Sequence, residues 1–159
     1  MDVAGIVMAA ACVQSTVPDV RAMPRKPWHL GLTPLLGIGV SLLILASAVV
    51  SFEHDATWMA TALAGAIMGL LRGRHIAVRT DQVWGTVRML AVHDAVIAAF
   101  CIFAIAAVAG LSGLFRPGTL PRHAHMAAAS ALFAGYLAGR AGSLMRRAVR
   151  APHTEFEPR

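Results

Sequence analysis

Five runs of apolar residues, separated by short polar segments, dominate the pattern of this chain. They cover residues 3–20, 30–52, 56–72, 89–115 and 123–145, with bounds that are approximate. A helix that crosses a bilayer needs about 20 mostly apolar residues, within a range of about 17–25. The second run carries no charge and reaches this length, whereas the first run is short. The pattern predicts an all-α integral membrane helical bundle with five transmembrane helices, or four if the first run does not span.

The polar segment between the third and fourth runs has a different pattern. Ile76, Val78, Val83 and Val87 flank the polar residues 79–82. Short extended pieces around a polar turn are typical of a hairpin. We therefore expect a short interfacial hairpin between helices 3 and 4. Residues 1–150 are expected to form a single transmembrane helical domain, and residues 151–159 a polar C-terminal tail.

Small residues recur at every fourth position in two of the runs. Residues four apart lie above one another on one helix face, and small residues let helix backbones approach closely within a bilayer. We expect these two faces to be internal helix contacts, with a homodimer interface as the alternative. The two series are Thr57, Thr61, Gly65, Gly69 and Gly73 in the third run, and Ala127, Ala131, Gly135, Gly139 and Ser143 in the fifth.

Composition and charge narrow the class of protein. The residues are 57% hydrophobic and only 14% charged, whereas a soluble domain is about 25% charged. This excludes a disordered chain and an ordinary water-soluble domain. The net charge of +6 would suggest nucleic acid in a soluble protein, but here the basic residues stand beside apolar runs. We therefore expect the lipid bilayer, and no nucleic acid, as a partner.

The basic residues also predict an orientation. With five spans, ten of the fourteen Lys and Arg residues fall on one side: three in 18–29, four in 72–88 and three in 146–150. Segments rich in Lys and Arg face the cytoplasm. This predicts a multi-pass protein with its N-terminus outside and its C-terminus cytoplasmic.

Asp94 and Arg140 are the two charges that lie clearly inside apolar runs. Charges at membrane depth are costly, and they are usually paired or functional. Both residues fall near the cytoplasmic ends of their runs, so we expect an intramembrane ion pair between them. In the alternatives, each side chain reaches the interface separately, or the two form a proton or anion site. If they pair, replacing both (Asp94→Asn with Arg140→Gln) should rescue either single change.

Seven histidines raise the question of haem or metal binding. They lack the spacing of known ligand motifs, and residues i and i+2, as in His123 and His125, point apart on a helix. We expect solvated interfacial histidines and no cofactor, with haem as the less favoured alternative. Cys12 and Cys101 lie in apolar runs, as small buried hydrophobic residues do. No catalytic residue is assigned.

The segment from Gly65 to Arg74, followed by Val78 to Trp84, resembles the core motif of the CcdC-like family. The closing helix, Gly135 to Arg147, is similar to the ending of such proteins. These are small bacterial membrane proteins associated by name with cytochrome c biogenesis. The resemblance implies a location in the bacterial cytoplasmic membrane. The chain departs from the family pattern by lacking a glycine after Asp81.

These observations predict a small non-enzymatic integral membrane protein, an accessory or assembly subunit of a membrane system such as cytochrome biogenesis. We expect it to have a membrane-protein partner or to form a homo-oligomer. The alternative is a small transport or proton-linked protein that uses Asp94 and Arg140. A second alternative is a haem- or metal-handling protein that uses its histidines.

Overall fold

A computed structural model describes residues 3–47, 52–81, 85–89, 91–111 and 123–151. The predicted tail from residue 152 and the part of the fourth run beyond residue 111 lie outside these residues. Within them, the regular elements are five helices and one two-stranded hairpin. In chain order the elements are α1 (Val3–Val20), α2 (His29–Ala46), α3 (Phe52–Arg74), β1 (Val78–Asp81), β2 (Thr86–Met89), α4 (Asp94–Leu111) and α5 (His123–Arg150).

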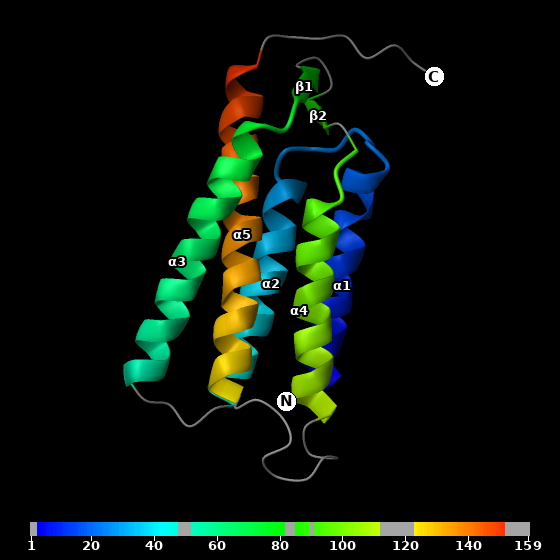
Figure 1. Ribbon diagram of the computed structural model, residues 1–159. Helices are drawn as coiled ribbons and strands as arrows, with labels where there is room; N and C mark the ends of the chain where they lie inside the picture. The colour runs from blue at the N-terminus through cyan, green and yellow to red at the C-terminus, as the bar shows by residue number, and fades with distance from the viewer. Residues whose placement is uncertain (1–2, 48–51, 82–84, 90, 112–122, 152–159) are drawn as a thin grey trace.

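The five helices lie side by side and alternate in direction, with α1, α3 and α5 running one way and α2 and α4 the other (Figure 1). α5 is central, because it packs against α2, α3 and α4. α1 lies on the side of the bundle away from α3 and packs against α2 and α4. α3 stands at the edge of the bundle and packs mainly on α5. This arrangement brings the α1–α2 connection, the hairpin and the C-terminal turns of α5 to one end of the bundle (Figure 1).

At that end of the bundle, the hairpin pairs with the α1–α2 connection. β1 and β2 are antiparallel, with register from Val78 opposite Met89 to Asp81 opposite Thr86. On the other edge of β2, the backbone of Arg25 exchanges two hydrogen bonds with Val87, at 3.0 and 2.8 Å. The connection therefore pairs with the free edge of the hairpin, as a short third strand would.

Several helix ends differ from those predicted. The third and fifth helices continue to Arg74 and Arg150, beyond the predicted ends at about 72 and 145. The fourth helix begins at Asp94 and not at residue 89, because Met89 is the last residue of β2. Met89 packs with Leu30 and Leu144 in a small apolar cluster under the hairpin. Hydropathy alone does not separate a short buried strand from a helix start, and this explains the difference.

The five predicted spans differ in whether their helices are long and apolar enough to cross a membrane. Among the described helices, α2 and α4 are long and apolar enough to cross a membrane, and Ala4–Val20 in α1 is apolar but shorter. α3 ends in Arg72 and Arg74, and α5 combines Ala and Gly with several charged residues. The structure therefore establishes a five-helix bundle with two helices of membrane-spanning character.

Candidate functional site

Asp94 lies at the first position of α4, where its carboxylate receives donors from three helices. The backbone N–H of Ala95 and the hydroxyl of Tyr136 each donate to it at 2.8 Å. Arg140 Nε, one turn after Tyr136 on α5, approaches at 3.3 Å. The structure therefore places Asp94 and Arg140 side by side, joined by an ion pair. Arg72 Nε from α3 lies 3.4 Å from the same carboxylate.

A second carboxylate, Asp19, lies on the other side of Arg140. Arg140 Nη1 donates to Asp19 Oδ2 at 2.9 Å, and Arg25 forms an ion pair with the other Asp19 oxygen. The side chains of Asp19 and Arg140 are only 2% and 4% exposed. We call Asp19, Arg25, Arg72, Asp94, Tyr136 and Arg140 the charge network. It links α1, α3, α4 and α5 at one end of the bundle.

Sequence reasoning missed Asp19, because Pro18 places it at the edge of a loop. The signal that could have found it is helical periodicity. Cys12, Thr16 and Asp19 recur at positions i, i+4 and i+7, and all three are almost fully buried. Such spacing marks one face of a helix. Tyr136 was also missed as a partner, although it lies four residues before Arg140 on the same face.

Charge is balanced inside the network. Arg25 and Arg140 oppose Asp19 and Asp94, while Arg72 stands at the outside with half of its side chain exposed. Burial lowers the pKa of Arg25, and the negative charge of Asp19 opposes this shift. Arg140 Nη2 is buried without a hydrogen-bond partner among the described residues. The arrangement can hold four helices in register, and it forms a hydrogen-bonded series of titratable groups.

The predicted small-residue faces lie against each other along α3 and α5. A Cβ added at Gly65 or Gly69 would overlap the backbone oxygen of Leu132 or Tyr136. Reciprocally, a Cβ at Gly135 or Gly139 would overlap the backbone of Ala62 or Ala66. The two faces therefore meet inside one chain, at a distance that only glycine permits.

The other members of the two series extend this contact unequally. On α5, Ala127, Ala131 and Ser143 are buried. Gly73 approaches Ser143, so the contact reaches the last turn of α3. At the opposite end Thr61 is half-buried and Thr57 is exposed. Close contact between α3 and α5 is therefore concentrated towards the end that carries the charge network.

Arg147 closes the C-terminal end of α3. Its Nη1 donates to the carbonyl oxygens of Gly73 and Arg74, each at 3.0 Å, and to that of Ile76. The carbonyls of Gly73 and Arg74 lie in the last turn of α3, which leaves C=O groups without partners inside the helix. A basic side chain satisfies them and also interacts well with the helix dipole.

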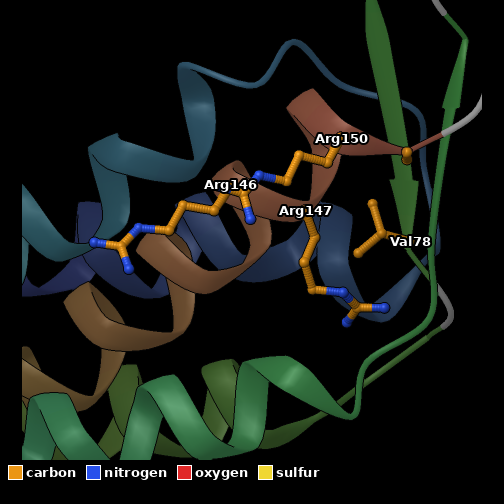
Figure 2. A pocket seen from close by; sticks show the side chains of 5 residues that line it. Val78, Arg146, Arg147 and Arg150 are labelled. Atoms are coloured by element: carbon orange, nitrogen blue, oxygen red, sulfur yellow. The ribbon is translucent and has the colours of Figure 1, made fainter.

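A hollow of about 330 Å³ lies beside this contact, at the basic end of the bundle. Its lining residues are Val78, Arg146, Arg147, Arg150 and Ala151. Figure 2 shows Arg147 extending away from Arg146 and Arg150, towards the end of α3. The three guanidinium groups do not converge on one point. This hollow is therefore a basic surface and not a closed anion cradle.

A second hollow, of about 260 Å³, lies between α3 and α4 and has α5 as its floor. Met68 and Ile97 form its two walls, and Phe133 lies on the floor. Asp94 and Tyr136 of the charge network close one end. We call this hollow the lateral groove.

The histidines that the structure describes lie near the ends of helices. His29 begins α2, His75 follows α3, His93 precedes α4, and His123 and His125 lie in the first turn of α5. The side chain of His54 and all of residue 153 lie outside the described set. Over the described ranges, no three His, Cys, Asp or Glu residues form a group that could hold a metal ion. Cys12 is buried and Cys101 half-buried, and both are free thiols.

No protein family, no curated protein and no solved structure matches this chain.

Proposed function

We propose that this chain is a five-span integral membrane protein that acts as a non-enzymatic accessory or assembly subunit. The observation that carries the proposal is the inverted distribution of polar and apolar side chains. Leu35, Leu63 and Ile97 are 62–68% exposed, whereas Asp19 and Arg140 are buried. Water-soluble proteins expose single apolar residues but seldom large contiguous apolar faces. A bilayer is the solvent that favours both features.

The exposed apolar side chains are spread over several helices, including those of lower mean hydropathy. On α3, Met59, Leu63, Ile67 and Leu71 are 50–65% exposed and follow one face at helical spacing. A face of this kind supports α3 as a span, although its ends are charged. The alternating directions of all five helices (Figure 1) support the same topology. Arg72 and Arg74 can extend to the lipid headgroups from the end of α3.

The proposed orientation follows from the basic end. The α1–α2 connection, the hairpin and the last turns of α5 meet there (Figure 1), and together with the end of α3 they carry the ten basic residues counted in the sequence. Trp28, which is 64% exposed, stands at this end, and tryptophan favours the membrane interface. We place this end in the cytoplasm and the N-terminus outside, in the bacterial cytoplasmic membrane.

The accessory role is supported by how the buried charges are used. The charges of the network pair with one another and tie helices together, as structural ion pairs do. The outer faces of α3 and α4 remain available to a membrane-protein partner or a second copy. The resemblance to the CcdC-like family adds cytochrome c biogenesis as the proposed setting.

Cysteine labelling tests topology and membrane insertion. In a Cys12→Ala, Cys101→Ala background, Val149→Cys should react with a membrane-impermeant maleimide only after the cells are opened. Leu35→Cys should stay unreactive in either case, because it faces lipid. Labelling of Val149→Cys in intact cells would reverse the orientation. Labelling of Leu35→Cys in carbonate-washed membranes would reject the α2 span.

Co-purification in mild detergent tests the accessory role. A defined membrane partner that is retained by the wild-type chain supports this role. An absorption spectrum of the same sample tests the second alternative, since a Soret band would favour a haem protein.

One observation favours a transport or proton-linked role as the second candidate. Tyr136, Asp94, Arg140, Asp19 and Arg25 form an unbroken series of polar contacts from α5 through α4 to α1. Arginine keeps its proton in proteins, so the groups of this series that can take up and release a proton are the Asp94 and Asp19 carboxylates. Purified protein in liposomes with an internal pH dye tests this candidate. A proton flux that Asp94→Asn abolishes would favour it over the accessory role.

A further inference from the structure

The lateral groove has an apolar wall on each side and a polar group at one end. Met68 of α3 and Ile97 of α4, which form the walls, are 56% and 62% exposed. Phe133 of α5 contributes an apolar floor. The Asp94 carboxylate and the Tyr136 hydroxyl, bonded to each other at 2.8 Å, close the end of the groove nearer the basic end. The groove therefore suits a ligand with an apolar body and a polar terminus.

The charge beside this polar end is positive. Arg72, at the last turn of α3, points its Nε to Asp94 at 3.4 Å while 52% of its side chain is exposed. Arg74, two residues later, is exposed on the same helix end. Basic residues near the cytoplasmic leaflet attract anionic lipid, each contributing about 1 kcal/mol.

We propose that the lateral groove binds one acyl chain of an anionic phospholipid, whose phosphate lies at Arg72. This inference rests on the proposed membrane location, because the groove opens on the face assigned to lipid. It goes beyond that proposal in assigning a binding site and a ligand class. The hydrocarbon chain fills the space between the apolar side chains of α3 and those of α4.

The charge at the end of the groove favours an anionic lipid over an apolar partner helix. Arg72 and Arg74 stand where a phosphate would lie, and basic residues attract anionic headgroups. The groove itself is a hollow of about 260 Å³ between α3 and α4. A hydrocarbon chain is thinner than a helix and flexible, so it fits between Met68 and Ile97 without separating α3 from α5.

Photolabelling in nanodiscs tests the proposal. The probe is phosphatidylglycerol with a diazirine in one acyl chain, diluted in phosphatidylcholine, and the matching phosphatidylcholine photolabel is run in parallel. Labelled peptides are identified by mass spectrometry. Ile97→Trp fills the groove with a side chain that starts exposed, and Phe100→Trp is its matched control. Phe100 lies on the same helix and is 59% exposed, but it does not line the groove.

The proposal expects the phosphatidylglycerol label on peptides of α3 and α4 around Met68 and Ile97. Ile97→Trp should remove this label, and Phe100→Trp should keep it. Arg72→Gln should lower the label about fivefold, which converts to about 1 kcal/mol. Arg74→Gln should have a smaller effect.

Three outcomes would overturn the proposal. They are equal labelling of all variants, equal labelling by the two lipids, and lipid label that is absent from the peptides around Met68 and Ile97. Failure of the membrane proposal is a separate result. In that case the wild-type chain would leave carbonate-washed membranes before any photolabel was applied.

Discussion

Asp19 is the residue on which most of the buried charge depends. It separates Arg25 from Arg140 and pairs with both. Its side chain is 2% exposed, whereas that of Asp94 is 15% exposed. Removing one partner of a buried ion pair costs about 3–5 kcal/mol, because the remaining charge has no compensation. Asp19, which the sequence did not single out, should therefore matter more to stability than Asp94.

We expect Asp19→Asn to lower the free energy of unfolding by about 3–5 kcal/mol, and Asp94→Asn to lower it by less. Tyr136 can still donate to an amide oxygen at position 94, and position 94 is closer to the surface. Circular dichroism of the detergent-solubilised variants during denaturant unfolding measures both values. Equal losses for the two variants would contradict this ranking.

The pairing also predicts a rescue. Adding Arg25→Gln to Asp19→Asn removes the unpaired guanidinium and leaves Arg140 with Asp94, which form a neutral pair. The double variant should be more stable than Asp19→Asn alone, and the same unfolding measurement shows it. Strictly additive losses would mean that Arg25 and Asp19 do not interact.

At the scale of elements, the contact between α3 and α5 depends on the absence of side chains. A Cβ at Gly69 would overlap the Tyr136 carbonyl oxygen, whereas nothing lies within 4 Å of a Cβ at Gly142. Both glycines are helical, so alanine improves helix propensity equally at each, by about 1 kcal/mol. Comparing alanine at these two positions therefore separates the effect of helix–helix packing on stability from the effect of helix propensity.

Gly69→Ala should destabilise the bundle by about 1–3 kcal/mol, the usual cost of overpacking. Gly142→Ala should leave the protein as stable or make it more stable. Thermal unfolding midpoints of the two variants in the same detergent provide the comparison. A Gly69→Ala variant as stable as Gly142→Ala would show that α3 and α5 are not in backbone contact there.

A second element-scale prediction concerns the end of α3. Arg147→Ala removes the donor to the carbonyl oxygens of Gly73, Arg74 and Ile76, and hydrogen bonds to charged groups contribute about 1.5–3 kcal/mol. Amide hydrogen exchange should therefore accelerate in residues 72–81. Arg146→Ala, at the neighbouring exposed position, should leave this exchange unchanged. The same acceleration in both variants would point to a general charge effect.

The sequence predicted those elements whose evidence is periodic. Glycines at every fourth position predicted the face of α3 that meets α5, and short extended pieces predicted the hairpin. The partners of buried charges were harder to predict, because pairing between distant segments leaves no local pattern. Asp94 and Arg140 stood out as charges inside apolar runs, but Asp19 resembled an ordinary loop residue. Arg147 likewise counted only as a cation for orientation, although it closes a helix.

At the scale of the whole molecule, substitutions on the outer surface test the proposed location in a bilayer. Leu63 is 63% exposed near the middle of α3, and Val149 is 84% exposed at the basic end. An arginine at the centre of a spanning helix costs about 2.5–3.5 kcal/mol in insertion. A surface substitution in water is usually neutral, within about 0.5 kcal/mol.

Leu63→Arg should therefore lower the amount of protein recovered in the membrane, and Val149→Arg should not. Quantitative immunoblotting of carbonate-washed membranes measures both. Full membrane recovery of Leu63→Arg would place this face of α3 away from lipid.

The ion pair between Asp19 and Arg140 joins positions 121 residues apart. This separation delays the pairing of the two side chains during synthesis of the chain. At about 5–20 residues per second, roughly 6–24 s pass between synthesis of the two partners. During that interval Asp19 has only Arg25 to neutralise it, and α3 lacks the helix on which it packs. α5, which is made after the other four helices of the bundle, is thus the one that completes it, so a nascent chain halted before α5 would carry exposed glycines and half-paired charges that cellular quality control can recognise.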